Sequence, residues 1–338
     1  MNNKTVLVVG GAGYIGAHMV RGLLDAGYDV VVLDNFSRGH RDLVPAVPLV
    51  EGDLGDTRLL DEVFSRYPVD AVMHFAAYSL VAESVARPLE YYRNNVSRTI
   101  DLLAAMSRHR IRRFIFSSTA AVYGEPSVAG AMREDHPMCP TNPYGATKLA
   151  VERLLADCAA AGTLNFVSLR YFNAAGADAS GELGERHDPE THLIPLALQV
   201  ALGMRERLQI FGTDYPTTDG TCIRDYVHVT DLAQAHLLAL ESLLGGGANA
   251  VYNLGNSKGY SVREVIEVAR QVSGRAIPTA PAERRAGDPA VLIADSQKIR
   301  QELGWRPRYE DLKTIVETAW LWHRREAERA GGAAGPLV

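Results

Sequence analysis

An α/β protein with a doubly wound parallel sheet is predicted from the first half of the sequence, where short apolar runs alternate with amphipathic stretches. Val6–Val9, Val30–Leu33 and Phe114–Phe116 are continuous apolar runs, as expected for parallel strands that are buried on both faces. Helical patterns over residues 14–26 and 89–109 lie between them. Repeated strand–helix–strand units of this kind favour a parallel sheet with helices on both faces.

The remaining elements suggest a second, smaller unit. Strands are also expected at 47–50, 71–75 and 166–170, a helix at 150–161, a loop rich in Gly, Asp and Glu at 174–188, and helices at 194–203, 232–243, 262–273 and 312–329. We therefore predict a first domain over 1–174 and a smaller, mixed α/β carboxy-terminal domain over 175–330, from which some chain returns to the first. Residues 331–338 are expected to form a flexible tail.

Composition and charge narrow the possible functions. The 338 residues are 47% hydrophobic and 22% charged, and the formal net charge of −5 argues against nucleic acid as the main partner. No run approaches the roughly 20 apolar residues of a membrane helix, and no basic segment with a cleavage site precedes the first strand. Cys139, Cys158 and Cys222 lack metal-ligand spacing. We expect a cytoplasmic protein with reduced thiols and without a metal, nucleic-acid or membrane partner.

A glycine-rich turn follows the first strand. Gly10, Gly13 and Gly16 form the pattern G-x-x-G-x-x-G. Without Cβ atoms such a turn lets a pyrophosphate approach the backbone, and the following helix offers unpaired N–H groups. Asp34 ends the second strand, where its carboxylate can accept hydrogen bonds from both adenosine ribose hydroxyls. The pattern predicts a Rossmann-type NAD site. Arg38 slightly weakens the preference for NAD over NADP, and a purely structural turn is the alternative.

A tyrosine and a lysine stand one turn apart at the start of a predicted helix. Asn142 can cap this helix and Pro143 suits its first position, so Tyr144 and Lys148 share one face. A phenol with a pKa of about 10 is a weak base at neutral pH, but a nearby ammonium and the positive nicotinamide of NAD+ would lower that pKa. Thr119 ends the fifth strand and could relay a proton from a substrate hydroxyl to Tyr144. A chance Tyr–Lys pair and an ordinary strand end are the alternatives.

Longer stretches are more specific. They are Ser117–Gly124, Tyr144–Lys148, Pro88–Tyr92, Asn94–Val96, Leu169–Asn173, Phe211–Pro216 and Arg224–Val229. With the glycine turn, they resemble the extended short-chain dehydrogenase/reductase family and, within it, the UDP-glucose 4-epimerases, from residue 4 to about residue 325. The resemblance implies an NAD-dependent isomerase that inverts C4 of a UDP-hexose through a 4-keto sugar, with Tyr144 as base and with Thr119 and Lys148 assisting.

The resemblance and the motifs together assign two sets of binding residues. The cofactor set is Gly10, Gly13, Tyr14, Ile15, Gly16, Asp34, Asn35, Asp53, Leu54, Phe75, Ala76, Ala77, Asn95, Tyr144, Lys148 and Tyr171. The substrate set is Thr119, Tyr144, Asn173, His192, Phe211, Arg224, Arg285, Asp288 and Leu292. Arginines suit the diphosphate because their planar fork matches its oxygens.

Four positions depart from the family pattern. Thr119 stands where the best-known members carry Ser and keeps the hydroxyl, whereas Ser79 removes a lysine that some members place near the cofactor. His192 replaces an Asn-type substrate contact and can still donate a hydrogen bond. Leu292 replaces a Tyr that narrows the sugar pocket, so the pocket is expected to admit an N-acetyl group as well.

Three alternative functions differ in how well the sequence excludes them. A nucleotide-sugar dehydratase needs an acid and a base after the threonine, and Ala120 and Ala121 occupy those places. A 4-epimerase of UDP-glucuronate or a UDP-pentose is less well excluded, and a non-catalytic NAD-binding regulator would have no need of Tyr144 and Lys148. The family also implies a homodimer formed through helices, with 84–108 and 142–161 as candidates.

Overall fold

A seven-stranded parallel sheet forms the larger part of the computed structural model, which describes residues 4–126, 130–285 and 287–331. Its strand order is β10 (Ala250–Leu254), β6 (Asn165–Tyr171), β5 (Arg113–Thr119), β4 (Val69–His74), β1 (Thr5–Val9), β2 (Asp29–Asp34) and β3 (Leu49–Glu51). Every neighbouring pair in it is parallel. The predicted doubly wound sheet is confirmed.

Alternate residues of each strand face two helical layers. One layer contains α1 (Tyr14–Asp25), α8 (Val229–Leu244) and α10 (Gln297–Glu302), which pack with strand residues such as Val8 and Val32. The other contains α2 (Thr57–Arg66), α5 (Arg98–Arg108) and α6 (Pro143–Ala160), which pack with Val9 and Phe116. Both faces are therefore apolar, which explains the continuous hydrophobic runs.

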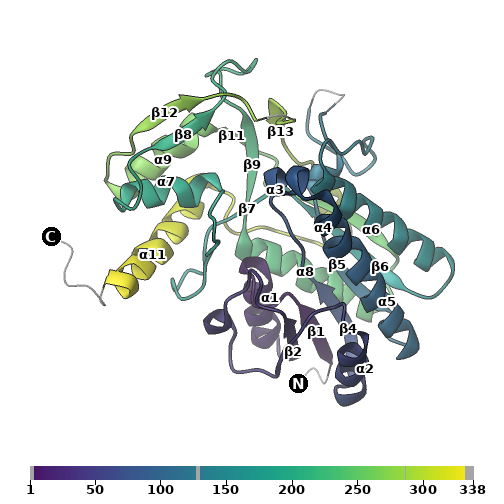
Figure 1. The fold of residues 1–338 in the computed structure, drawn as a ribbon. Coiled ribbons are helices and arrows are strands. Elements are labelled where there is room, and N and C mark those ends of the chain that lie inside the picture. The colour runs from purple at the N-terminus through teal and green to yellow at the C-terminus, as the bar shows by residue number, and fades with distance from the viewer. Residues whose placement is uncertain (1–3, 127–129, 286, 332–338) are drawn as a thin grey trace.

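The second lobe is built around short strands and three helices (Figure 1). β9 (Ile223–His228) pairs with β7 (Asn173–Ala175), β11 (Gly259–Ser261) and β13 (Val291–Leu292), and β8 (Leu208–Phe211) pairs with β12 (Thr279–Ala282). α7 (Leu193–Ala201), α9 (Val262–Ser273) and α11 (Leu312–Gly331) share an apolar core with these strands. Chain from beyond residue 175 also reaches the large sheet, because β10 is its edge strand and α8 and α10 cover it.

Element boundaries differ from the sequence expectations at several places. The stretch expected to be one long helix comprises α4 (Pro88–Tyr92), a π-helical turn (Arg93–Ser97) and α5, with α3 (Val81–Ala86) before it. The third strand begins at Leu49, one residue after a proline that cannot donate to the ladder. By contrast, α9 has the expected bounds, because Ser261 and Glu264 form a capping box and Gly274 ends the helix at φ 64°. In the expected tail, residues 332–338 lie outside the described residues.

Candidate active site

The glycine turn after β1 is packed too closely for side chains. A Cβ on Gly16 would lie 2.1 Å from the Gly10 carbonyl oxygen, and one on Gly10 would lie 2.5 Å from the backbone nitrogen of Ala76. Gly10 also has φ 79°, a region that suits glycine. Gly13 is the N-cap of α1 and supplies no side-chain oxygen to the first N–H groups of the helix. These features fit a pyrophosphate held by the helix N-terminus.

The carboxyl ends of β2 and β3 place two aspartates beside this turn. The Asp34 carboxylate accepts the N–H groups of Ala12 at 2.9 Å and Phe36 at 2.8 Å, and burial raises its pKa. Asp53 accepts Asn35 Nδ2 at 2.9 Å and pairs with Arg98. Each Asp34 oxygen keeps a second lone pair, so this carboxylate could still accept ribose hydroxyls. The neighbouring Leu54 is 7% exposed and belongs to the core.

Asn95 stabilises the segment after β4, which contains Phe75, Ala76 and Ala77. Its amide exchanges two hydrogen bonds of 2.9 Å with the backbone of Tyr78, and it donates to Thr147 Oγ1 at 3.1 Å. Asn95 is 3% exposed. The structure therefore gives Asn95 a bracing role between this segment and α6, and its contact with the cofactor stays a prediction.

Tyr144, Thr119 and Lys148 come together where α6 meets the end of β5. Asn142 caps α6 by accepting the Gly145 N–H at 2.9 Å, as the sequence predicts. The Thr119 hydroxyl lies near enough to the Tyr144 phenol to act on its pKa, and it also accepts the Ala121 N–H at 3.2 Å. One turn further on, Lys148 is 3% exposed and its Nζ donates to the Ser117 carbonyl at 2.7 Å. The structure therefore brings the three predicted catalytic residues together, and their proton-relay role stays a prediction.

Burial dominates the protonation of Tyr144 and Lys148. It raises the pKa of Tyr144, against the lowering effect of the Thr119 hydroxyl. Burial also lowers the pKa of Lys148 to about 7, with Glu152 opposing. Lys148 is not among the groups that act on the Tyr144 pKa in the protein alone, so the expectation that its ammonium, together with the nicotinamide, lowers this pKa stays a prediction.

A buried ion pair that the sequence analysis missed lies beneath these residues. Arg170 on β6 donates to Glu152 on α6 at 2.6 Å and 3.0 Å, with the two side chains 3% and 5% exposed. Ser118 and Tyr123 complete the network, since Ser118 donates to Glu152, and Arg170 donates to the Tyr123 hydroxyl at 2.8 Å. The available signal was that Glu152 follows Lys148 by one further helical turn.

Two aromatic residues of the predicted cofactor set are tied into the protein. Tyr14 is 8% exposed and its hydroxyl donates to the Gly176 carbonyl at 2.6 Å, while the neighbouring Ile15 packs against the core. Tyr171 is 6% exposed, and its hydroxyl lies 3.0 Å from His236 Nε2. The structure thus gives both side chains packing roles, and any cofactor contact by either residue stays a prediction.

The predicted substrate residues fall into local groups in the second lobe. Arg224 pairs with Asp288 at 2.9 Å, and Leu292 lies opposite Arg224 in the β9–β13 register. The Arg285 guanidinium lies 4.1 Å from the Phe211 ring centroid, a cation–π contact. Leu292 also packs against the apolar cluster of Ala120, Val122, Tyr123, Met132 and Leu149, which lies next to Thr119 and Lys148 along the chain.

Asn173 and His192, two further residues of the predicted substrate set, are bonded to other groups of the protein. Asn173 Nδ2 donates to the Asp225 carbonyl at 2.8 Å, which leaves its carbonyl oxygen for a ligand. His192 Nδ1 lies 2.7 Å from Glu185 and 3.2 Å from Glu190, so only its Nε2 faces elsewhere. Burial opposes protonation of His192, but the two carboxylates raise its pKa to about 10.

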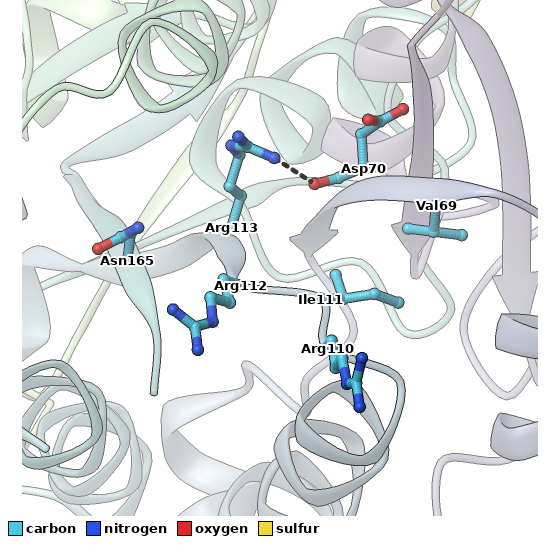
Figure 2. A pocket seen from close by; sticks show the side chains of 7 residues that line it. All are labelled: Val69, Asp70, Arg110, Ile111, Arg112, Arg113 and Asn165. Atoms are coloured by element: carbon cyan, nitrogen blue, oxygen red, sulfur yellow. Dashed lines mark hydrogen bonds between the residues drawn. The ribbon is translucent and has the colours of Figure 1, made fainter. Parts of the chain in front are cut away.

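A surface cavity lies away from this site. Figure 2 shows it at the amino ends of β4, β5 and β6, where Arg113 donates to the Asp70 carbonyl. Its lining also includes Arg110, Arg112 and Asn165. Ligands of doubly wound sheets bind at the carboxyl ends of the strands, so this cavity is not the predicted site.

Comparison with known proteins agrees with this geometry. Residues 6–255 match the NAD dependent epimerase/dehydratase family. The chain belongs to this family. It is 56% identical over 319 residues to a UDP-glucose 4-epimerase of Halalkalibacterium halodurans, covering 94% of this chain and 95% of the relative.

Solved structures of the family also resemble this chain in sequence and in fold. A UDP-glucose 4-epimerase from Brucella ovis in complex with NAD is 50% identical with a TM-score of 0.91, covering 94% of this chain and 97% of that one. A UDP-Glc/GlcNAc 4-epimerase from Campylobacter jejuni is 43% identical with a TM-score of 0.83, covering 96% and 100%. The predicted family, enzyme class and NAD cofactor are confirmed. Within the described ranges, no helix combines the length and apolar character that a bilayer crossing requires.

Replacing Glu152 by Gln is expected to destabilise the fold by about 3–5 kcal/mol, because it leaves the buried Arg170 guanidinium without its counter-charge. Urea unfolding followed by circular dichroism measures this loss. Glu328→Gln is the matched control, since its pair with Arg324 on α11 is exposed and is expected to contribute less than about 1 kcal/mol. Equal losses in the two variants would contradict the role of the buried pair.

Proposed function

We propose that this chain catalyses reversible C4 epimerisation of UDP-glucose and UDP-galactose. The observation that carries the proposal is the approach of the Thr119 hydroxyl to the Tyr144 phenol at the carboxyl end of β5, where this hydroxyl acts to lower the Tyr144 pKa, one helical turn from Lys148. The pair lies at the sheet edge where the glycine turn offers a dinucleotide its phosphate site. Relatives that are named UDP-glucose 4-epimerases support the choice of substrate.

In the proposed reaction, Tyr144 accepts the proton of the sugar 4-hydroxyl, with Thr119 as the relay. Bound NAD+ would supply a reversible hydride acceptor for C4, which is the chemistry that passage through a 4-keto sugar needs. Tyr144 would return the proton to the new hydroxyl, so that the cycle closes without net oxidation. Lys148 would hold the nicotinamide ribose. The Ser117 carbonyl orients its ammonium group.

The UDP group is proposed to anchor the sugar while the sugar turns. Arg224 and Arg285 suit the diphosphate and the uracil region, because one is already oriented by Asp288 and the other lies over the Phe211 ring. Asn173 and His192 add hydrogen-bonding groups. A nucleotide held only through these contacts leaves the hexose free to present either face to the cofactor.

The leucine at position 292 favours a second pair of substrates. Leu292 replaces the larger aromatic residue that narrows the pocket in strict hexose enzymes, so we propose that UDP-N-acetylhexosamines are accepted as well. The Campylobacter jejuni relative is named a UDP-Glc/GlcNAc 4-epimerase, which supports this reading. UDP-glucuronate and UDP-pentoses are the alternatives and belong in the same substrate panel.

We propose a homodimer because α3, α4 and α5, the helices on either side of the π-helical turn, expose large apolar side chains. Val81, Val85, Leu89, Tyr92 and Ile100 are 43%, 63%, 80%, 43% and 47% exposed, and all lie on α3, α4 or α5. Large apolar side chains gathered in this way mark a protein interface. These helices overlap 84–108, one of the two segments predicted for dimerisation, whereas the other, 142–161, corresponds to α6. A cytoplasmic location remains part of this proposal.

Tyr144→Phe is expected to lower kcat on UDP-galactose by at least about 100-fold, because the variant has no phenol to accept the proton. A coupled assay without added NAD measures the rate, and denaturation followed by chromatography identifies any nucleotide that the protein retained. Tyr67→Phe, on the surface beyond α2, is the control and is expected to keep full activity. A Tyr144→Phe variant with bound NAD and unchanged kcat would refute the mechanism.

Leu292→Tyr is expected to reduce kcat/KM for UDP-N-acetylgalactosamine, relative to UDP-galactose, by about tenfold or more, because the larger ring occupies the space of the acetyl group. Leu292→Met, with nearly the same volume, should preserve the ratio. If the unmodified enzyme converts UDP-galactose but shows no turnover of the acetylated sugar, the wider pocket is wrong.

Leu89→Asp is expected to shift the protein from the mass of two chains to that of one in light scattering, because a charge would be buried at the centre of the apolar surface. Met204→Asp, at an exposed apolar residue in the other lobe, should leave the mass unchanged. A monomeric wild-type protein, or a dimeric Leu89→Asp variant, would contradict the assignment of this surface.

A further inference from the structure

Two glutamates and two histidines converge within the short segment 185–192, which we call the 185–192 cluster. His192 Nδ1 lies 2.7 Å from Glu185 Oε1, and His187 Nδ1 lies 3.0 Å from the same oxygen. Glu190 approaches both rings, at 3.2 Å from His192 and 3.9 Å from His187. One nitrogen or oxygen atom from each of the four side chains lies within 4.8 Å of the other three. Four potential ligand atoms therefore lie close together in space.

The carboxylates of this cluster are buried without a permanent cation. Glu185 is 4% exposed and Glu190 is 8% exposed. Among the described residues, their ion pairs are only with the two histidines, while the adjacent Arg186 pairs with other acidic groups. Two buried negative charges need compensation close by. Either protonated histidines or a divalent cation can supply it.

The spacing of the four atoms suits a tetrahedral cation. Metal–ligand bonds of roughly 2.0–2.2 Å in a tetrahedral zinc site place neighbouring ligand atoms about 3.3–3.5 Å apart. Four nitrogen–oxygen distances within the cluster, from 2.7 to 3.9 Å, lie on either side of that value, and one ligand atom from each side chain lies within 4.8 Å of the others. Side-chain rotations would close the longer separations before all four groups contact one ion. Two imidazoles favour a transition-metal ion over Mg2+ or Ca2+, which prefer oxygen ligands alone.

The carboxylates are also held in place by the surrounding backbone. Glu190 Oε1 accepts the N–H groups of Thr191 at 2.7 Å and His192 at 2.8 Å. The Glu185 carbonyl accepts Nε1–H of Trp322 on α11 at 2.9 Å. Outer contacts of this kind orient metal ligands and keep them from collapsing onto other partners.

We propose that the 185–192 cluster binds one transition-metal dication, with zinc as the ion that fits best. The ion replaces the protons on the histidines and balances both carboxylates with the histidines neutral. It fastens a segment that crosses between the lobes. Within this segment His187 lies in ring contact with Tyr14 of α1, and the Arg186 carbonyl lies 3.0 Å from His40 Nε2. The site is therefore structural and lies beside the predicted cofactor turn.

Metal binding would also fix the tautomer of His192. With Nδ1 on the ion, Nε2 must carry the hydrogen, and the side chain is 48% exposed. His192 then serves as a permanent N–H donor toward the UDP-sugar. This last step rests on the proposed function, whereas metal binding does not.

The test is metal binding by the full chain. Protein stripped with a chelator and reloaded is expected to retain about one zinc per chain in elemental analysis, as in other sites with four protein ligands. Cobalt(II) in its place should give the intense visible absorption of a tetrahedral site. Zinc should raise the melting temperature of the stripped protein. His187→Ala and Glu190→Gln should each weaken binding more than about tenfold.

His109→Ala is the matched control, because His109 forms a similar pair with Asp61 at 3.0 Å on the surface without further ligands. It should retain the metal and the cobalt spectrum. Folded wild-type protein that retains no zinc and gives no visible cobalt band overturns the proposal, as does an unchanged cobalt spectrum in both cluster variants. Circular dichroism identifies a variant that fails to fold, and the wild-type measurements then decide. An unchanged KM for UDP-galactose in His192→Ala, which has no side-chain donor, would refute only the donor role.

Discussion

The position of α6 on the sheet is the constraint on which the candidate site depends. Tyr144, Lys148 and Glu152 follow one another at intervals of one helical turn, and the last two are fixed to neighbouring strands. Lys148 donates to the Ser117 carbonyl on β5, and Glu152 pairs with Arg170 on β6. Since β5 and β6 are in parallel register, these two contacts leave Tyr144 one location, beside Thr119 at the carboxyl end of β5.

Local patterns could be predicted from the sequence because their causes are local. The capping box of Ser261 and Glu264 defines the start of α9, and the close approach of Gly16 to Gly10 explains why the turn after β1 needs glycines. The apolar runs that predict the parallel sheet reflect burial on both faces, which holds wherever helices cover a sheet on both sides. The proximity of Thr119 and Tyr144 could be predicted for the same reason, since a strand end and a helix start are each recognised from a few residues.

Long-range partners could not be predicted in this way. Arg170 lies within a strand that is otherwise mostly apolar, and only the fold reveals that Glu152 lies within reach. Asp225 is a second case. Its buried carboxylate accepts the N–H groups of Asn256, Ser257 and Ala294, which lie 31, 32 and 69 residues further along the chain, and burial raises its pKa to about 7. The pKa of Tyr144 could not be predicted from the sequence either, because burial is a property of the packed molecule and not of the Tyr–Lys spacing.

The protonation states bear directly on how such a site would work. Burial favours the neutral phenol of Tyr144 and lowers the charge on Lys148 at neutral pH, so the protein alone holds a weak base. A positive ring beside the phenol would favour its ionised form, and neutralising that ring would favour return of the proton. The basicity of Tyr144 would then follow the charge of its neighbour, strong when a hydride is to be removed and weak once it has been removed. In the part of the chain that the structure describes, burial and the Thr119 hydroxyl are the influences on the Tyr144 pKa, and a tyrosine in that setting would suit a reaction that runs in both directions.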